Sequence, residues 1–99
     1  MIPQLEKLAA AGIELVPAAS LPNHFLFMRE GFVSLVERRG DAFGSIGCPA
    51  LVTEHGLALL LWRGEKAVFV AKDHEQPASE EQVGALRRFA DDLAAALAH

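Results

Sequence analysis

The stretch LALLLWRGEKAVFVA, residues 57–71, decides the fold class of this chain. It contains two apolar runs, residues 57–62 and 67–71, on either side of the polar segment Arg63-Gly64-Glu65. Each run has the length of a strand, and the connection between them is far too short for a crossover. The stretch therefore predicts two antiparallel strands joined by a tight turn.

The same pattern continues toward the N-terminus, where apolar runs again alternate with short turns such as Glu30-Gly31 and Arg39-Gly40-Asp41. We expect strands over residues 24–29, 32–38, 43–53, 57–62 and 66–72. Because all the connections are short, these strands should pair with their neighbours as an antiparallel meander of about five strands. Residues 73–78 read as a polar linker, and the sequence leaves open whether residues 13–16 join the sheet.

A helix is predicted at each end of the meander. Pro3 suits the first turn of a helix, and Gly12 is a natural left-handed stop. Ser79 begins the second helix with an S-x-x-Q capping box, completed by Gln82. Its apolar stripe consists of Val83, Leu86, Phe89, Ala90, Leu93 and Leu97. Arg87 with Asp91, and Arg88 with Asp92, have the four-residue spacing of helical ion pairs. The fold class is thus α+β, one domain over residues 1–99 with both helices packed on the sheet.

Composition narrows the possible partners. The chain has 99 residues, of which 52% are hydrophobic and 22% charged, and a formal net charge of −4. The high apolar fraction is typical of a globular protein. The negative net charge argues against binding to nucleic acid or to an anionic membrane. The longest apolar run, residues 57–62, is far shorter than the roughly 20 residues of a membrane span. With no secretory pattern at the N-terminus, we expect a cytoplasmic protein, and Ala- and Arg-rich usage suggests a bacterial one.

The predicted sheet has more apolar surface than two helices can cover. The strands over 24–29, 57–62 and 66–72 are apolar at consecutive positions, so both faces of the sheet are apolar. Two helices cover about one face of such a sheet. The other face should meet a second copy, a protein partner or a small apolar ligand, and we expect a homodimer. The candidate interface residues are Leu57, Leu59, Leu61, Trp62 and Arg63.

Chemistry-bearing residues are few. Cys48 could be a nucleophile if His55 or Glu54 approached it, but a lone cysteine in this apolar context favours burial as a small hydrophobe. Because Cys48 is the only cysteine of the chain, an intramolecular disulfide is excluded. Gly47 and Pro49 on either side of it indicate a bulge, a bend or a close approach of another backbone. Glu54-His55-Gly56 reads as an exposed turn.

These observations favour a non-catalytic dimeric domain, which could be an adaptor, a chaperone-like protein or a ligand-sensing module. We expect no catalytic residue, no metal ligand set and no cofactor. The alternative is a small-ligand-binding domain, or an enzyme subunit that uses Cys48 with His55 or Glu54. The order of helix, meander and helix is similar to the layout of profilin-like and secretion-chaperone-like domains, a similarity that implies no function.

Overall fold

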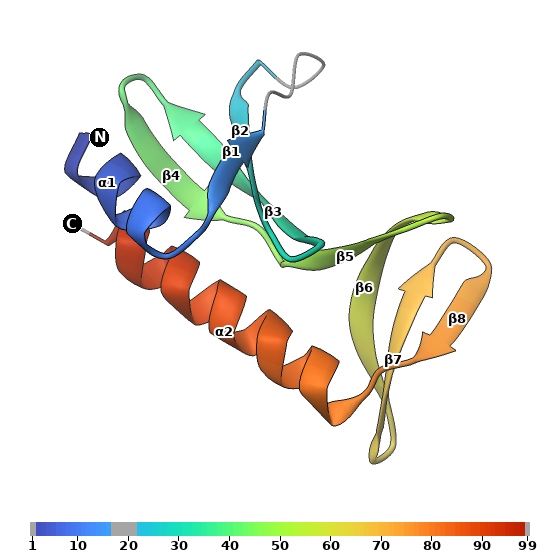
Figure 1. Ribbon diagram of the computed structural model, residues 1–99. Coiled ribbons are helices and arrows are strands. Elements are labelled where there is room, and N and C mark those ends of the chain that lie inside the picture. The colour runs from blue at the N-terminus through green and yellow to red at the C-terminus, as the bar shows by residue number, and fades with distance from the viewer. Residues whose placement is uncertain (1, 17–21, 99) are drawn as a thin grey trace.

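The computed structural model describes residues 2–16 and 22–98, and Figure 1 shows their arrangement. Two helices, α1 (Ile2–Ala10) and α2 (Glu80–Leu97), frame eight strands. The strands are β1 (Glu14–Val16), β2 (His24–Arg29), β3 (Phe32–Arg39), β4 (Ala42–Ile46), β5 (Ala50–Thr53), β6 (Gly56–Arg63), β7 (Lys66–Ala71) and β8 (His74–Pro77). The α+β class and the antiparallel pairing are as predicted, but about five strands was too low a number.

The sheet follows the order β1-β2-β3-β5-β6-β7-β8, and every pairing is antiparallel. Residues 13–16, left open by the sequence, supply β1 at one edge of the sheet. Residues 74–77, predicted to be part of a linker, form β8 at the other edge instead. The four residues of β8 are all exposed, so backbone pairing with β7 holds them in place and apolar burial does not.

The predicted strand over 43–53 is broken in two at Gly47, Cys48 and Pro49. Its first half, β4, pairs with one part of β3 and its second half, β5, pairs with another part, so the sheet branches here. The Gly47 amide donates to the Leu35 carbonyl at 2.7 Å, and the Ser34 hydroxyl donates to the Gly47 carbonyl at 2.9 Å. The close backbone approach that Gly47 and Pro49 predicted is therefore confirmed.

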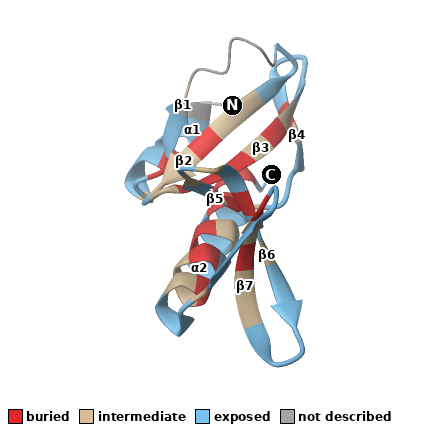
Figure 2. Cartoon of the chain, turned by 90° about the vertical axis from the view of Figure 1, so that its right-hand side faces the viewer, coloured by how far each residue is buried: buried red, intermediate tan, exposed pale blue. Residues whose placement is uncertain are grey.

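Helix α2 begins as predicted, with Ser79 and Gln82 forming the capping box. Its buried residues are Val83, Leu86, Phe89, Leu93, Ala96 and Leu97. The Phe89 ring is stacked on the Phe32 ring of β3, with centroids 6.5 Å apart. Because Phe32 points toward α2, we call this side of the sheet the inner face and the opposite side the outer face. Figure 2 shows the buried residues gathered where α2 meets the sheet.

The Arg29 side chain of β2 contacts both the end of α1 and helix α2. It donates to the Ala11 carbonyl at 3.0 Å and to the Asp92 carboxylate of α2 at 2.8 Å. The guanidinium also lies 5.7 Å from the centre of the Phe89 ring. Asp92 is thus paired across the fold, and neither predicted helical ion pair, Arg87 with Asp91 or Arg88 with Asp92, forms within the described residues.

The molecule is elongated, with extents of 40 × 26 × 19 Å and a radius of gyration of 13.9 Å. A compact domain of this length has a radius of gyration of about 13 Å. In Figure 1 the hairpin of β6 and β7 projects beyond the first turn of α2. No helix of the described part of the chain is long and apolar enough to cross a membrane.

The branch point gives a stability prediction. A Cβ atom at Gly47 would lie 3.0 Å from the Leu35 carbonyl oxygen, a backbone atom that the ladder holds in place. We expect Gly47→Ala to lower the free energy of unfolding by about 1–3 kcal/mol, measured by urea denaturation. Gly84→Ala is the matched control, since its Cβ meets only the end of the Arg88 side chain and a helical alanine is favourable. Equal stability of Gly47→Ala and wild type would contradict the prediction.

Candidate functional site

Cys48 lies in the segment between β4 and β5 and is exposed, so the favoured interpretation of a buried cysteine was wrong. The apolar context of its neighbours does not bury it, because Cys48 lies between the two strands and belongs to neither. Cys48 precedes β5 and His55 follows it. The four extended residues of β5 alone span about 13 Å, which keeps the His55 imidazole out of reach of the thiol.

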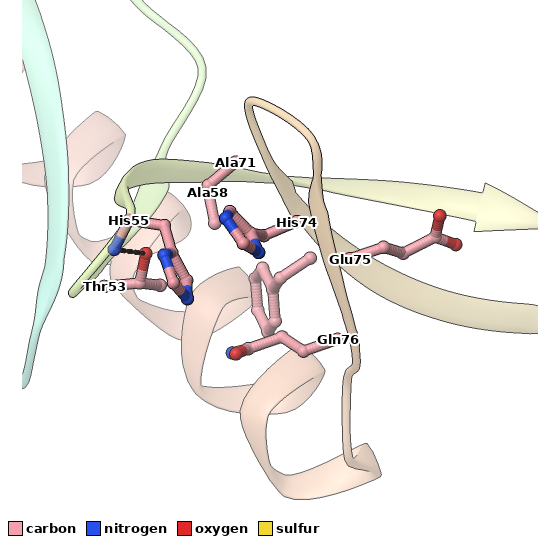
Figure 3. Close-up of a pocket in the computed structure, with 8 residues that line it drawn as sticks. Thr53, His55, Ala58, Ala71, His74, Glu75 and Gln76 are labelled. Atoms are coloured by element: carbon pink, nitrogen blue, oxygen red, sulfur yellow. Dashed lines mark hydrogen bonds between the residues drawn. The ribbon is translucent and has the colours of Figure 1, made fainter.

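His55 has a different neighbour, which the sequence did not predict. Its imidazole ring is stacked on that of His74 from β8, with centroids 3.6 Å apart and planes 14° from parallel. Figure 3 shows the two rings side by side, with the Glu75 side chain directed away from them. The His55 amide is held by the Thr53 hydroxyl at 3.2 Å, and Glu54 Oε1 lies 3.4 Å from His55 Nε2. No sequence signal joined His74 to His55, because β8 was interpreted as a linker.

The pocket beside the two rings is small. It has a volume of about 110 Å³ and is lined by Thr53, His55, Ala58, Phe69, Ala71, His74, Glu75 and Gln76. Small-molecule sites usually have volumes of roughly 300–1,000 Å³, so this pocket fits a few waters. Nowhere in residues 2–16 and 22–98 do three or more His, Cys, Asp or Glu side chains gather as a metal site would require.

The outer face of the sheet carries several exposed apolar side chains. Residues directly opposite one another in antiparallel strands project to the same face, and one row crosses seven strands on the outer side. It passes in order through Glu14, Met28, Val33, Ala50, Leu59, Val70 and Glu75. Val33 and Ala50 are buried, yet neither belongs to the core cluster on the inner face. The outer face therefore has an apolar centre of its own.

The most exposed part of this face lies on β6. Leu57, Leu59 and Leu61 alternate along the strand and are 54%, 48% and 45% exposed, and Val52 opposite Leu57 is 49% exposed. On the neighbouring strand β7, Val70 lies opposite Leu59 and Val68 lies opposite Leu61, on the same face of the sheet. We call these six residues of β5, β6 and β7 the outer patch. It is apolar across three neighbouring strands, and no element of the described chain covers it.

Charged side chains border the outer patch. Arg63 forms a two-bond ion pair with Glu75, at 2.6 Å from Nε and 3.1 Å from Nη2. The hydrogen bonds that Arg63 donates to the Glu75 carboxylate, together with the negative charge of that group, raise the pKa of the Arg63 guanidinium above its usual range. Lys66 stands opposite Arg63 in the ladder. An apolar centre with a charged rim is the usual composition of a protein interface.

The predicted interface residues do not form one surface. Side chains alternate along a strand, so Trp62 projects to the inner face while Leu57, Leu59 and Leu61 project to the outer face. Trp62 is 53% exposed, and its ring lies 5.9 Å from the guanidinium carbon of Arg87 on α2. It forms one wall of an open groove between the β6–β7 hairpin and the start of α2, with a volume of about 640 Å³.

The position of Cys48 can be tested directly. Since the thiol is exposed, we expect Ellman's reagent to titrate one thiol per chain in the native protein without denaturant. The same count in urea is the control for full reaction. A native protein that releases almost no chromophore until urea is added would show that Cys48 is covered.

Comparison with known proteins yields no relative. No protein-family model, no curated protein and no solved structure matches the chain.

Proposed function

We propose that this chain is a non-catalytic interaction domain that acts as a homodimer, with the outer patch as the interface between the two copies. The observation that carries the proposal is the row of half-exposed leucines on β6. Fully burying one such side chain stabilises a protein or a complex by about 1.5–3 kcal/mol. Because each leucine is about half exposed, a large part of this free energy would be gained only when another surface covers it. A second copy would supply the missing cover.

The area of the outer patch is that of a small interface. Strands lie about 4.8 Å apart and rise about 3.3 Å per residue, so β5, β6 and β7, with 4, 8 and 6 residues, project to roughly 290 Å². The relief of the side chains increases the accessible area above this flat projection. Stable interfaces bury about 800 Å² per partner, and the largest apolar patches tolerated on monomers measure about 300–600 Å². The outer patch is therefore comparable with the largest apolar patches of monomers, and a dimer interface of standard size would also include its charged border.

The arrangement of residues also suits a twofold axis. In a twofold dimer the same patch meets itself, so it has to be complementary to its own copy. A patch of leucine and valine satisfies this condition without matched charges, because apolar contact has no direction. The charged residues, Arg63, Lys66 and Glu75, lie at its border, where a dimer would leave them hydrated.

The catalytic alternative has less support. Cys48 and His55 are at opposite ends of β5, and Glu54 contacts His55 while its own side chain is 86% exposed. A nucleophile needs a base within hydrogen-bonding reach, and the geometry around Cys48 supplies none from His55 or Glu54. The surface that remains unexplained is apolar, which suits association.

The proposal is tested by the mass of the protein in solution. We expect light scattering during gel filtration, at 10–100 µM chain, to give twice the 10.7 kDa of one chain. Leu59→Glu would place two carboxylates in the centre of the interface, and since burying an unpaired charge costs several kcal/mol, dimerisation should weaken at least about 100-fold.

Leu5→Glu is the matched control, because Leu5 is an exposed leucine of α1, outside the patch. It should remain a dimer, and the circular dichroism of both variants should match that of wild type. A wild-type protein with the mass of one chain at 100 µM, or equal masses for the two variants, would refute the proposal.

A further inference from the structure

We propose that the groove beside Trp62 binds a small amphipathic carboxylate, with its apolar part against the indole ring and its carboxylate on Arg87. Trp62 and Arg87 are not part of the outer patch, and the groove shares only Val68 with it. The proposal therefore goes beyond self-association and does not depend on it.

The groove has apolar walls on both sides. Trp62 and Ala67, which stand opposite each other in the β6–β7 ladder, form one wall. Val83 and Gly84 of α2 form part of the other, and Ala78 lies in the segment that connects the two elements. Gly84 has no side chain, which leaves the helix backbone open to the groove. A volume of about 640 Å³ is within the usual range of roughly 300–1,000 Å³ for small-molecule sites.

Trp62 is unusually placed for a core residue. Tryptophan is highly buried on average, yet here more than half of its surface is exposed in a groove on the helix-covered side of the sheet. Burial of such a ring is a large source of binding energy, and exposed tryptophans are frequent anchors of binding sites. An apolar chain or ring laid across Trp62 would gain contact with the indole and with Val83 together.

Arg87 supplies the recognition of a negative charge. Its guanidinium lies over the Trp62 ring, and among the described residues it forms no ion pair and no hydrogen bond from its side chain. Guanidinium binds carboxylate through two parallel N–H bonds, and packing against an aromatic ring fixes its plane for that contact.

The other charged residues of the groove do not neutralise Arg87. Glu80 is in the first turn of α2, seven residues and therefore about 10 Å along the helix from Arg87. Lys66 stands opposite Arg63 in the ladder and so projects to the outer face, and Glu65 is in the hairpin turn. The groove thus has Glu80 at one end and Arg87, over the ring, at the other. This polarity fits a carboxylate at Arg87 with an apolar chain along Val83.

Trp62 is the only tryptophan, and the chain has no tyrosine, so intrinsic fluorescence reports on this groove alone. We would titrate the full chain at constant ionic strength with octanoate, and in parallel with octyltrimethylammonium and butyrate. We expect octanoate to shift the emission to the blue with saturation below about 5 mM. Octyltrimethylammonium tests the need for a negative charge, butyrate tests the need for an apolar chain, and both should bind at least 10-fold more weakly.

Variants assign the effect to the groove, with the heat of binding measured by calorimetry as a second readout. Arg87→Gln should weaken octanoate binding at least about 10-fold, whereas Arg88→Gln, the next residue and not part of the groove, should leave it unchanged. Gly84→Leu places a bulky side chain at a residue that lines the groove without removing a charge, and should abolish binding. Leu59→Glu should bind octanoate as wild type does, which separates this proposal from dimerisation.

No saturable change with octanoate, equal binding of the cationic amphiphile, or an equal effect of Arg87→Gln and Arg88→Gln would overturn the proposal.

Discussion

The structure depends on one constraint: side chains alternate between the two faces of a strand, so a strand that is apolar at consecutive positions has two apolar faces. β6 shows the result, with Ala58 buried against the inner core and Leu57 and Leu59 exposed on the outer side. The chain has one long helix, and α2 lies along the inner face (Figure 1). The apolar surface of the outer face follows directly from this imbalance.

The branch at Gly47 determines how that surface is arranged. Because β4 and β5 pair with different parts of β3, the sheet divides into a part that contains the branch and a hairpin that extends past the start of α2. The hairpin has exposed leucines on its outer side and exposes Trp62 on its inner side. Both proposed sites, the outer patch and the groove, thus involve this hairpin.

Local patterns in the sequence predicted the parts of the fold that depend on local physics. The apolar stripe and capping box of α2, the turns between strands, and the break around Gly47 and Pro49 are all encoded within a few residues of where they occur. β8 was missed because His74-Glu75-Gln76-Pro77 has no apolar side chain to bury, and only backbone pairing with β7 makes it a strand. The stacking of His74 on His55 was missed with it. The pairing of Asp92 with Arg29, 63 residues away, likewise leaves no local trace.

The composition of β8 has a consequence for how single copies of the chain behave toward one another. This outermost strand is short and polar, and Pro77 has no N–H to offer to another chain. A sheet that exposes leucines would otherwise be a template for open-ended growth of fibrils through strand addition. With this edge blunted, strand addition at β8 is disfavoured, and the dimer proposed above uses a face of the sheet, where contact between two copies would close on itself. The polar edge therefore lets a newly made chain carry an exposed apolar surface with less risk of aggregation.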